Sequence, residues 1–225
     1  MTRGAAVAAE RRHSVGRRRD GLVVAAGRDG SDELDVGHWL DIVAVAAGNV
    51  HTAANTGRSH TVGLRSDGTV VATGWNADGQ CSLDAWADVV AVAAGWRRTL
   101  GLRSDGRVLT AGRASEGACD VQDWREVVAI SCGDWHSVGV RADGTAVAAG
   151  SNRRGQSDVD AWRELTDVAA GYLHTVGLRR DGRVVKAGSP ASATGVDRWQ
   201  DVTAVAAGSY HTVGVTAAGL SLIHI

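Results

Sequence analysis

The sequence lacks several features that would place the protein in a familiar functional class. No segment has the run of about 18 or more apolar residues that a membrane-spanning helix needs. Residues 1–19 are Arg-rich and broken by charge, so they lack the apolar stretch of a secretory signal, although they also fit a basic targeting tail. The formal net charge of −1 gives no general attraction to nucleic acid or to an anionic membrane. We therefore expect a cytoplasmic protein whose partners include neither nucleic acid nor membrane.

Motifs for catalysis and phosphate binding are also missing. The 30 glycines separate short apolar runs, and none belongs to a Gly-rich turn that opens into a helix with Lys and Ser or Thr, which excludes a phosphate-binding loop. The chain has no Gly-x-Ser-x-Gly segment, which excludes the nucleophile elbow of the α/β-hydrolases. We expect a protein that is not an enzyme, with no catalytic residues, no cofactor and no bound metal.

What the sequence does contain is one phrase repeated five times. An Asp-Gly pair marks each copy, and the steps between the pairs are 47, 38, 38 and 38 residues. The pairs are Asp20-Gly21, Asp67-Gly68, Asp105-Gly106, Asp143-Gly144 and Asp181-Gly182. A Trp stands nine residues before a Gly in each copy, at Trp39, Trp86, Trp124, Trp162 and Trp199. Units of this length cannot bury an apolar face alone, so neighbours must stack to make the core, and the five Trp are expected to pack between them.

The longest step contains an insertion. The 47 residues equal the 38-residue unit plus nine, because the sequence Asn-Val-His-Thr at 49–52 is echoed by Arg-Ser-His-Thr at 58–61. The other copies omit these nine residues while the flanking register is unbroken. We expect 53–61, or the near-equivalent 52–60, to form a protruding extension between the first two strands of the second unit.

Each unit is expected to form three strands. Alternation is plain in 174–179, where His174, Val176 and Leu178 share one face. An Asp-Gly pair between two such runs predicts a hairpin, because Asp and Gly tolerate the positive φ angles of a tight turn. The Val-rich run before them, such as 89–95, supplies the third strand, and 38 residues leave little room for a fourth. Helix is improbable since Gly recurs at fixed positions and costs about 1 kcal/mol in a helix interior.

Small antiparallel sheets repeated radially predict an all-β fold, a β-propeller of 38-residue repeats with three-stranded blades. The Ala- and Gly-rich first strand suits the crowded centre of a ring. Residues 7–225 make one domain of five complete units and a partial sixth, and 1–6 are an N-terminal extension. Residues 220–225 occupy the position expected for the third strand of the sixth unit, but they lack the Val-Ala-Gly sequence of the other third strands.

The repeat resembles the regulator of chromosome condensation repeat family, whose members are seven-bladed propellers. The resemblance is strongest in Ser-Cys-Gly-Asp-Trp-His-Ser at 131–137, followed by Asp143-Gly144 and by Gly-Ser-Asn-Arg-Arg-Gly-Gln at 150–156, and 74–80 repeat that last loop. It covers nearly the whole chain, is specific for the fold and says little about function. Because five units and a partial sixth fall short of seven, either the ring is incomplete or the sequence is a truncated propeller.

The short repeat departs from part of that family. Nucleotide-exchange members have longer repeats and a protruding wedge that has no counterpart in this sequence. The 38-residue units are similar instead to the short-repeat bacterial type, such as the type II β-lactamase inhibitory protein. Arg outnumbers Lys by 23 to 1, a skew typical of GC-rich bacterial genomes.

Histidine and cysteine recur at repeat positions and are expected to be structural. The repeated histidines are His13, His60, His136, His174 and His211, and Arg98 takes their place in the third unit. Packed sheets lie about 10 Å apart, so these histidines cannot converge on one metal ion, and we expect each to bond to backbone within its own blade. A two-histidine surface site at His51 and His60 is a weaker alternative. Cys81 and Cys119 are one unit apart, too far for a disulfide of about 4.4–6.8 Å between Cα atoms, and Cys132 reads as a small buried hydrophobe.

One pair of positions varies between copies while its surroundings stay fixed. It directly follows the Gly of the first strand and holds both tyrosines and two of the non-periodic tryptophans. The residues that we expect to contact a protein partner there are Trp96, Arg97, Asp134, Trp135, Tyr172 and Tyr210. Trp, Tyr and Arg are enriched in interface hot spots, and an exposed ring of them predicts a non-enzymatic protein-binding module.

Two alternatives to the binding rim stay open. The aromatic side chains could fold back over the blade edges as packing. The protein could also be a guanine-nucleotide-exchange-type regulator or an enzyme that uses the axial pocket. Rim aromatics that converge on one exposed face would favour a binder, and a deep polar axial pocket with clustered titratable groups would favour an enzyme.

Overall fold

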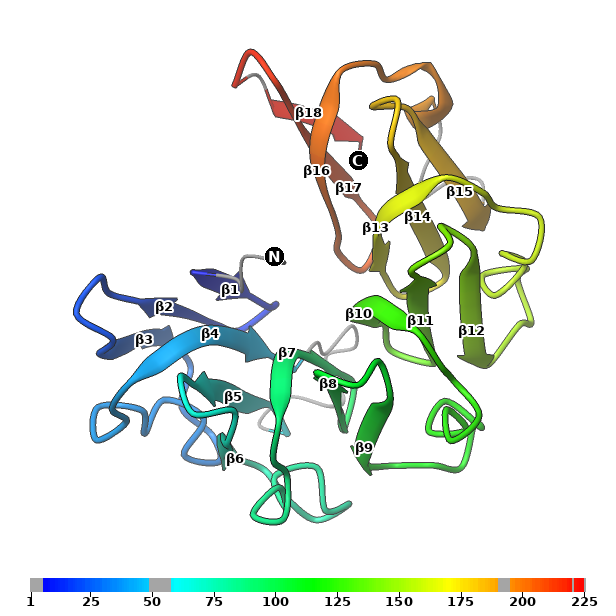
Figure 1. Cartoon of the computed structure of the whole chain (residues 1–225). Coiled ribbons are helices and arrows are strands. Elements are labelled where there is room, and N and C mark those ends of the chain that lie inside the picture. Colours follow the sequence, from blue (N-terminus) through cyan, green and yellow to red (C-terminus); the bar gives the residue numbers. More distant parts are fainter. Residues whose placement is uncertain (1–5, 49–57, 190–194, 220, 225) are drawn as a thin grey trace.

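The computed structural model describes residues 6–48, 58–189, 195–219 and 221–224, and it is all-β apart from one turn of 3₁₀ helix at η3 (Val196–Arg198). Eighteen strands form six separate three-stranded antiparallel sheets, each built from consecutive strands (Figure 1). The first three blades are β1 (Val7–Ala9), β2 (His13–Arg17), β3 (Val23–Gly27); β4 (Ile42–Ala47), β5 (His60–Arg65), β6 (Val70–Gly74); β7 (Val89–Gly95), β8 (Arg98–Arg103), β9 (Val108–Gly112). The last three are β10 (Val127–Cys132), β11 (His136–Arg141), β12 (Ala146–Gly150); β13 (Leu165–Ala170), β14 (His174–Arg179), β15 (Val184–Gly188); β16 (Val202–Ala207), β17 (Thr212–Thr216), β18 (Ser221–His224).

The three-stranded blade predicted from the repeat is confirmed, and the sixth unit gains its third strand. β18 pairs antiparallel with β17, with Val213 opposite Ile223 and Gly214 opposite Leu222. Leu222 packs against the hydrophobic cluster of the last two blades. A strand that lacks the Val-Ala-Gly sequence therefore still forms the third strand of the sixth blade. The expected extension at 52–61 lies mostly outside the described residues, as do His51 and all but Ala6 of the proposed N-terminal extension.

The blades stand side by side around one axis (Figure 1). β1, β4, β7, β10, β13 and β16 are the inner strands, because residues from all six line the same central cavity. In the four interior blades every residue of the middle strand except its last is buried, since a neighbouring blade covers each face. The middle strands of the first and sixth blades alternate between buried and more exposed positions.

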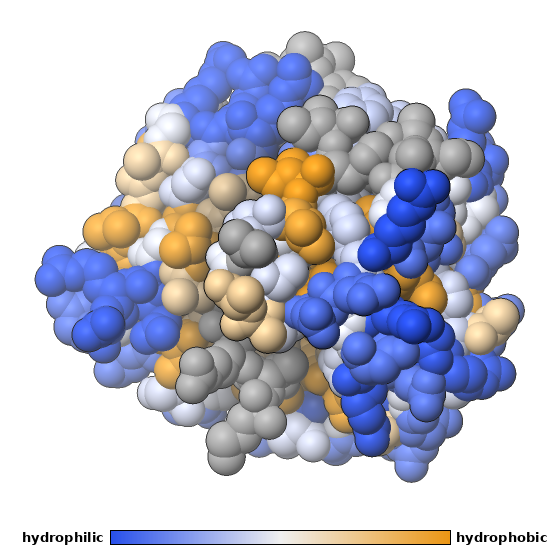
Figure 2. All heavy atoms as spheres, turned by 90° about the horizontal axis from the view of Figure 1, so that it is seen from above, coloured by the Kyte–Doolittle hydropathy of each residue, from blue (hydrophilic) through white to orange (hydrophobic). Residues whose placement is uncertain are grey.

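The ring is open between the first and the sixth blade (Figure 1). Their exposed apolar side chains include Val7, Val24, Val215 and Ile223, which are 68%, 55%, 37% and 60% exposed. Figure 2 views the molecule from above Figure 1 and shows hydrophobic surface lying between strongly hydrophilic areas. Interior blades bury the equivalent faces against a neighbour, so the two terminal blades leave apolar surface in contact with water.

The Asp-Gly turns form as predicted, but the aspartate stabilises the turn through its side chain and not through a positive φ angle. In the second blade Gly68 has φ +82° and its N–H donates to the carbonyl of Arg65, whose own N–H donates to the carbonyl of Thr69. This is a type I turn followed by a left-handed Gly. Asp67 does not adopt the positive φ expected for it, because its carboxylate instead accepts the Thr69 N–H at 2.9 Å. Aspartate therefore caps the turn through its side chain, and Gly alone supplies the left-handed backbone.

The periodic tryptophans are scaffold, as predicted. Trp86 belongs to a buried cluster that joins Val62 of the second blade to Val89 of the third. Its ring lies against Gly101 in β8, where an added Cβ would be 2.6 Å from the indole. Four of the five periodic tryptophans are buried. Trp199, which precedes the first strand of the sixth blade in the sequence, is partly buried. The Gly in the middle strand recurs because any side chain there would displace the indole that packs neighbouring blades together.

Four of the five repeated histidines connect consecutive blades, so for these four the expectation of bonding within one blade is wrong. Their Nε2 atoms lie beside a Thr hydroxyl of the following blade, at His13–Thr61 2.8 Å, His60–Thr99 2.9 Å, His136–Thr175 2.7 Å and His174–Thr212 3.1 Å. Sequence reasoning missed this because the partner comes from the next repeat. Arg98 makes the same connection differently, donating from Nη2 to the carbonyls of Gly133, Asp134 and His136 in the fourth blade.

Cys81, Cys119 and Cys132 are all free thiols, and burial raises the pKa of Cys81 to about 12. In the described part of the chain, no helix has both the length and the apolar character that crossing a membrane requires.

Candidate functional site

The variable turns and the loops after the third strands lie at the same end of the blades. In the third blade Arg98 pairs with Gly112 across the sheet, and the N–H of Arg113 donates to the carbonyl of Arg97 at 2.9 Å. The same contact joins Ser151 to Trp135 in the fourth blade. We call this end the rim and define it by residues 75, 96–97, 113, 134–135, 172–173 and 209–210. The Asp-Gly turns lie at the opposite end because they close the other end of the second and third strands.

The predicted aromatic residues come together in two pairs across blade boundaries. Trp96 of the third blade lies against Trp135 of the fourth, with ring centroids 4.4 Å apart. Tyr172 of the fifth blade meets Tyr210 of the sixth edge to face, with centroids 5.6 Å apart. Equivalent positions in neighbouring blades thus approach closely enough for direct ring contact.

The expectation of a fully exposed ring is wrong for two residues. Trp96 is 5% exposed and Asp134 is 0% exposed, whereas Tyr210 is 57% exposed. Trp135, Tyr172 and Arg97 are half-buried. For Trp96 the alternative interpretation holds, because this side chain folds back over the blade edges and is covered by its neighbours. Of the six predicted residues, Trp135, Tyr172, Tyr210 and Arg97 are therefore the accessible ones.

Arginine and tryptophan alternate in a stack beside the first pair. The guanidinium carbon of Arg97 lies 4.7 Å from the ring centroid of Trp75 and 4.6 Å from that of Trp96. Arg113 covers Trp96 at 4.7 Å, and Arg58 lies 5.7 Å from Trp75. We call Arg58, Trp75, Arg97, Trp96 and Arg113 the Arg-Trp stack. Guanidinium groups at these distances from an indole are attracted by the negative face of the ring.

Three members of this stack, Arg58, Trp75 and Arg113, were missed in the sequence. Trp75 and Arg113 both follow directly after the last Gly of a third strand, and the loop of Trp75 carries the family's Asn and Gln. Trp75 is the one Trp that falls neither in the nine-residue register nor in the variable turn, and that exception was the available signal. Nothing local in the sequence links Arg113 to Trp96.

Arg97 is the most constrained cation of the rim. Its backbone is left-handed, with φ +59°. Burial lowers the pKa of Arg97 below its ordinary value, and the positive charges of Arg58 and Arg113 act in the same direction while Asp78 opposes them. Nη1 of Arg97 lies 3.5 Å from a carboxylate oxygen of Asp78, a long contact for an ion pair.

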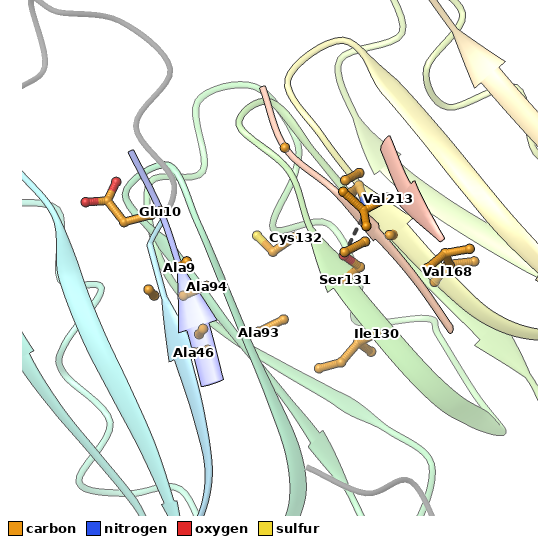
Figure 3. A pocket seen from close by; sticks show the side chains of 18 of the residues that line it. Ala9, Glu10, Ala46, Ala93, Ala94, Ile130, Ser131, Cys132, Val168 and Val213 are labelled. Atoms are coloured by element: carbon orange, nitrogen blue, oxygen red, sulfur yellow. Dashed lines mark hydrogen bonds between the residues drawn. The ribbon is translucent and has the colours of Figure 1, made fainter. Parts of the chain in front are cut away.

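The axial cavity has a different character from the rim. It has a volume of about 940 Å³, and Ala is the commonest residue of its walls, with Ile130, Val168 and Val213 among the larger side chains (Figure 3). Glu10, Asp167 and His211 are among its titratable lining residues. Ser131 accepts a hydrogen bond from the N–H of Ala170 at 3.0 Å, which ties the fourth and fifth blades together on the cavity wall. Burial raises the pKa of Asp167. Among the described residues, His, Cys, Asp and Glu form no group of three or more that could hold a metal ion.

The fold and the rim define a class of protein, a repeat protein of radially arranged three-stranded blades. The family model of the regulator of chromosome condensation (RCC1) repeat matches residues 55–80, 89–118 and 127–156. Three segments of the chain thus match the regulator of chromosome condensation repeat, as its sequence motifs indicated. No curated protein sequence matches the chain.

Solved structures of low sequence identity share this fold. The ectodomain of the Physcomitrella patens receptor kinase CR4 superposes with a TM-score of 0.80 at 20% identity, and the match covers 97% of this chain and 63% of that one. The CRINKLY WD40 ectodomain of the Arabidopsis thaliana receptor kinase ACR4 gives 0.72 at 18% identity, covering 96% and 77%. Yeast RCC1 (Prp20) bound to Kap60 gives 0.71 at 17% identity, covering 96% and 68%. The chain thus spans less than two thirds of the CR4 ectodomain, and these identities establish the fold alone.

Proposed function

We propose that this protein is a non-enzymatic interaction module that binds a protein partner through its rim. The observation that carries the proposal is the pairing of Tyr172 with Tyr210 and of Trp96 with Trp135 across blade boundaries at one end of the ring. Tyr210 is 57% exposed, although an aromatic ring gains by burial. Large aromatic side chains held rigidly at a surface are the residues that dominate protein interfaces.

The six proposed partner-binding residues would have different roles. Trp135, Tyr172, Tyr210 and Arg97 reach the surface and would contact the partner. Trp96 and Asp134 are buried and would support the others, Trp96 by packing beneath Trp135 and Arg97. A binding surface whose anchors are already held by buried neighbours loses little side-chain entropy on association.

Proteins with the same fold support protein binding as the kind of function. Yeast RCC1 (Prp20) has been crystallised bound to Kap60, and Prp20p from Saccharomyces cerevisiae has been characterised for its binding to Gsp1p and histones. At 17% identity these partners do not transfer to this chain. Partner identity depends on the residues of the site, and fold similarity alone does not determine it.

The rival function, a nucleotide-exchange-type regulator or an enzyme, would use the axial cavity. Its volume of about 940 Å³ is sufficient for a small molecule. Ala is the commonest residue of its walls, and titratable lining residues such as Glu10, Asp167 and His211 come from the first, fifth and sixth blades. Figure 3 shows Glu10 on the opposite side of the view from Ser131 and Val168. The rim therefore has the stronger support.

The test compares rim variants with a matched surface variant. Tyr210→Ala and Trp135→Ala are prepared beside Leu40→Ala, which removes a 60%-exposed side chain outside the rim. Proteins captured from the source cells by the parent chain are identified, and their affinities are measured by titration. We expect the two rim variants to lose about tenfold or more in affinity and Leu40→Ala to lose almost none. Equal affinity in all variants, with folding intact, would reject the rim as the binding surface.

A further inference from the structure

The Arg-Trp stack has the chemistry to recognise one particular feature of a partner. We propose that it receives carboxylate side chains from an acidic segment of the protein partner, with Arg97 as the central recognition residue. This inference rests on the proposed function, since it names the partner's chemistry at the same rim. Four guanidinium-to-indole contacts between 4.6 and 5.7 Å, in alternating order, provide the framework.

Stacking orients the guanidinium of Arg97. A guanidinium that lies over an indole uses its face for the ring, so its N–H groups point outward along its edge, where a carboxylate binds with two parallel hydrogen bonds. Trp75 and Trp96 contact Arg97 from two loops that belong to different blades. The planar group is thus preorganised before any partner arrives, which lowers the entropic cost of binding.

Arg97 is also short of negatively charged neighbours within the described residues. Arg113 has close contacts to Glu116, with Nε 2.7 Å and Nη2 2.6 Å from the same carboxylate oxygen. Within the described residues, the contact of Arg97 to a carboxylate is the 3.5 Å approach of Nη1 to Asp78, and because Nε is buried, the Nη groups are the donors that a partner carboxylate would meet. Of these two arginines, Arg97 therefore has the weaker contact to a carboxylate of its own chain.

The local charge favours an added anion. Arg58, Arg97 and Arg113 bring three positive charges together, against the two negative charges of Asp78 and Glu116. The lowered pKa of Arg97 reflects its burial and the repulsion from the two other arginines. A partner carboxylate would relieve this repulsion, and because the site is partly desolvated its attraction would exceed that at an open surface.

The observations favour an acidic protein segment over nucleic acid. Asp78 and Glu116 flank the stack, and the closely spaced phosphates of a duplex, one per about 1.7 Å of helix axis, would meet both carboxylates, whereas a peptide can place one carboxylate at Arg97 with its other acidic side chains turned away. A single carboxylate needs only the edge of Arg97. The indole of Trp75, half-buried beside it, offers an apolar surface for the methylene groups of Glu or Asp.

The experiment uses defined probes and the full chain. A peptide of about ten residues containing several Glu, its counterpart with Gln in place of Glu, and a duplex DNA of about 20 base pairs are titrated at low salt, with tryptophan fluorescence as the signal. Arg97→Gln and Arg97→Lys are compared with Arg107→Gln, which removes the same charge from an exposed side chain at the opposite end of the third blade. Circular dichroism of each variant confirms folding.

We expect the Glu peptide to bind the parent chain and Arg107→Gln equally, and the Gln peptide to bind neither. Arg97→Gln should weaken binding of the Glu peptide by about tenfold or more, and Arg97→Lys by less, since charge is kept but the planar fork is lost. Equal binding of the Glu and Gln peptides, an equal loss in Arg97→Gln and Arg107→Gln, or no saturable binding would overturn the proposal. Tighter binding of the DNA than of the Glu peptide would overturn it in favour of nucleic acid.

The experiments distinguish failure of the proposed binding rim from failure of the proposed carboxylate site. Loss of partner affinity in Tyr210→Ala, with unchanged Glu-peptide binding in Arg97→Gln, would remove the carboxylate site and leave the binding rim. Loss of Glu-peptide binding in Arg97→Gln, with unchanged partner affinity in Tyr210→Ala and Trp135→Ala, would leave the carboxylate site and remove the aromatic rim.

Discussion

Nε2 of His60 lies 2.9 Å from the hydroxyl oxygen of Thr99, and this contact crosses from the second blade to the third. The Thr99 hydroxyl donates its own proton to the carbonyl of Gln80 at 2.8 Å. It must therefore accept from the histidine, so the imidazole carries its proton on Nε2. The arrangement recurs where His136 meets Thr175, which donates to the carbonyl of Gln156. A chain of imidazole, hydroxyl and carbonyl thus joins one blade to the next.

Removing one histidine should weaken the interface between two blades. We expect His136→Ala to lower the free energy of unfolding by about 1–3 kcal/mol, because a buried hydrogen bond is lost and a space is left beside Gly133. His38→Ala, whose side chain is 66% exposed, is the control and should change stability by less than about 0.5 kcal/mol. Urea unfolding followed by circular dichroism measures both. Equal stability of the two variants would mean that the histidine link contributes nothing.

The same histidines should make stability depend on pH. Burial lowers the pKa of His60 and of His136 from 6.5 to about 3, so both stay neutral in the folded chain. Between pH 6.5 and about 3 the unfolded chain binds protons that the folded chain does not. The free energy of unfolding should therefore fall as pH falls through this window, and it should be regained above pH 6.5.

Carboxylates also titrate between pH 6.5 and about 3, so the pH dependence of one protein alone does not isolate the histidines. The informative quantity is the difference in the pH dependence of stability between a histidine variant and the parent chain. His136→Asn should show a shallower loss of stability between pH 6.5 and 4.5 than the parent chain, because one of the depressed groups is gone. Urea unfolding at several pH values gives the two slopes. Parallel slopes would contradict the assignment of a neutral buried imidazole.

Arg98 stands at the interface between the third and fourth blades, where the other repeats have histidine. The variant Arg98→His tests whether histidine can form the link at this interface. Its Nε and Nη1 are buried and have no hydrogen-bond partner among the described residues, while Nη2 serves three carbonyls. We expect Arg98→Ala to destabilise by about 3 kcal/mol, since those carbonyls lose their donor. Arg98→His should cost less than about 1 kcal/mol, because Ser137 already offers a hydroxyl that donates to the carbonyl of Ala118. Both variants are measured by thermal unfolding. If Arg98→His were no more stable than Arg98→Ala, the histidine-to-hydroxyl hydrogen bond could not replace the arginine at this interface.

The contact between Trp and Gly should be intolerant of any side chain. A Cβ at Gly101 would lie 2.6 Å from the ring of Trp86, whereas one at Gly37 would meet nothing within 4 Å. We expect Gly101→Ala to destabilise by about 1–3 kcal/mol through overpacking, and Gly37→Ala to have little effect. Differential scanning calorimetry of the two variants measures the contrast. Similar melting temperatures would show that the indole can move aside without cost.

The open ring should associate with itself at high concentration. The first and sixth blades expose Val7, Val24, Val215 and Ile223, and apolar sheet faces in water favour association. Sedimentation velocity should show a sedimentation coefficient that rises with concentration. Replacing Val24 and Ile223 by Lys should reduce that rise. A single monodisperse species with high stability at every concentration would show that six blades are self-sufficient.

Local and periodic features of this protein were readable from its sequence. Strands, hairpins and the three-stranded blade follow from alternation and turn residues within one unit, and the 38-residue period implies stacking. The scaffold role of Trp86 and its equivalents was predictable because each recurs in the same register as the Gly that it covers. Every copy repeats the same local rules, so the sequence determined the fold class almost completely.

The tertiary structure decided how the copies face one another. The partner of His60 is Thr99 of the next blade, and the partners of Arg97 are Trp75 and Trp96 from two different loops. These contacts depend on the rotation and separation between neighbouring blades, which a period in sequence does not encode. For the same reason the sequence placed Trp96 and Tyr210 at equivalent positions, while packing buried the first and left the second 57% exposed at the open end of the ring.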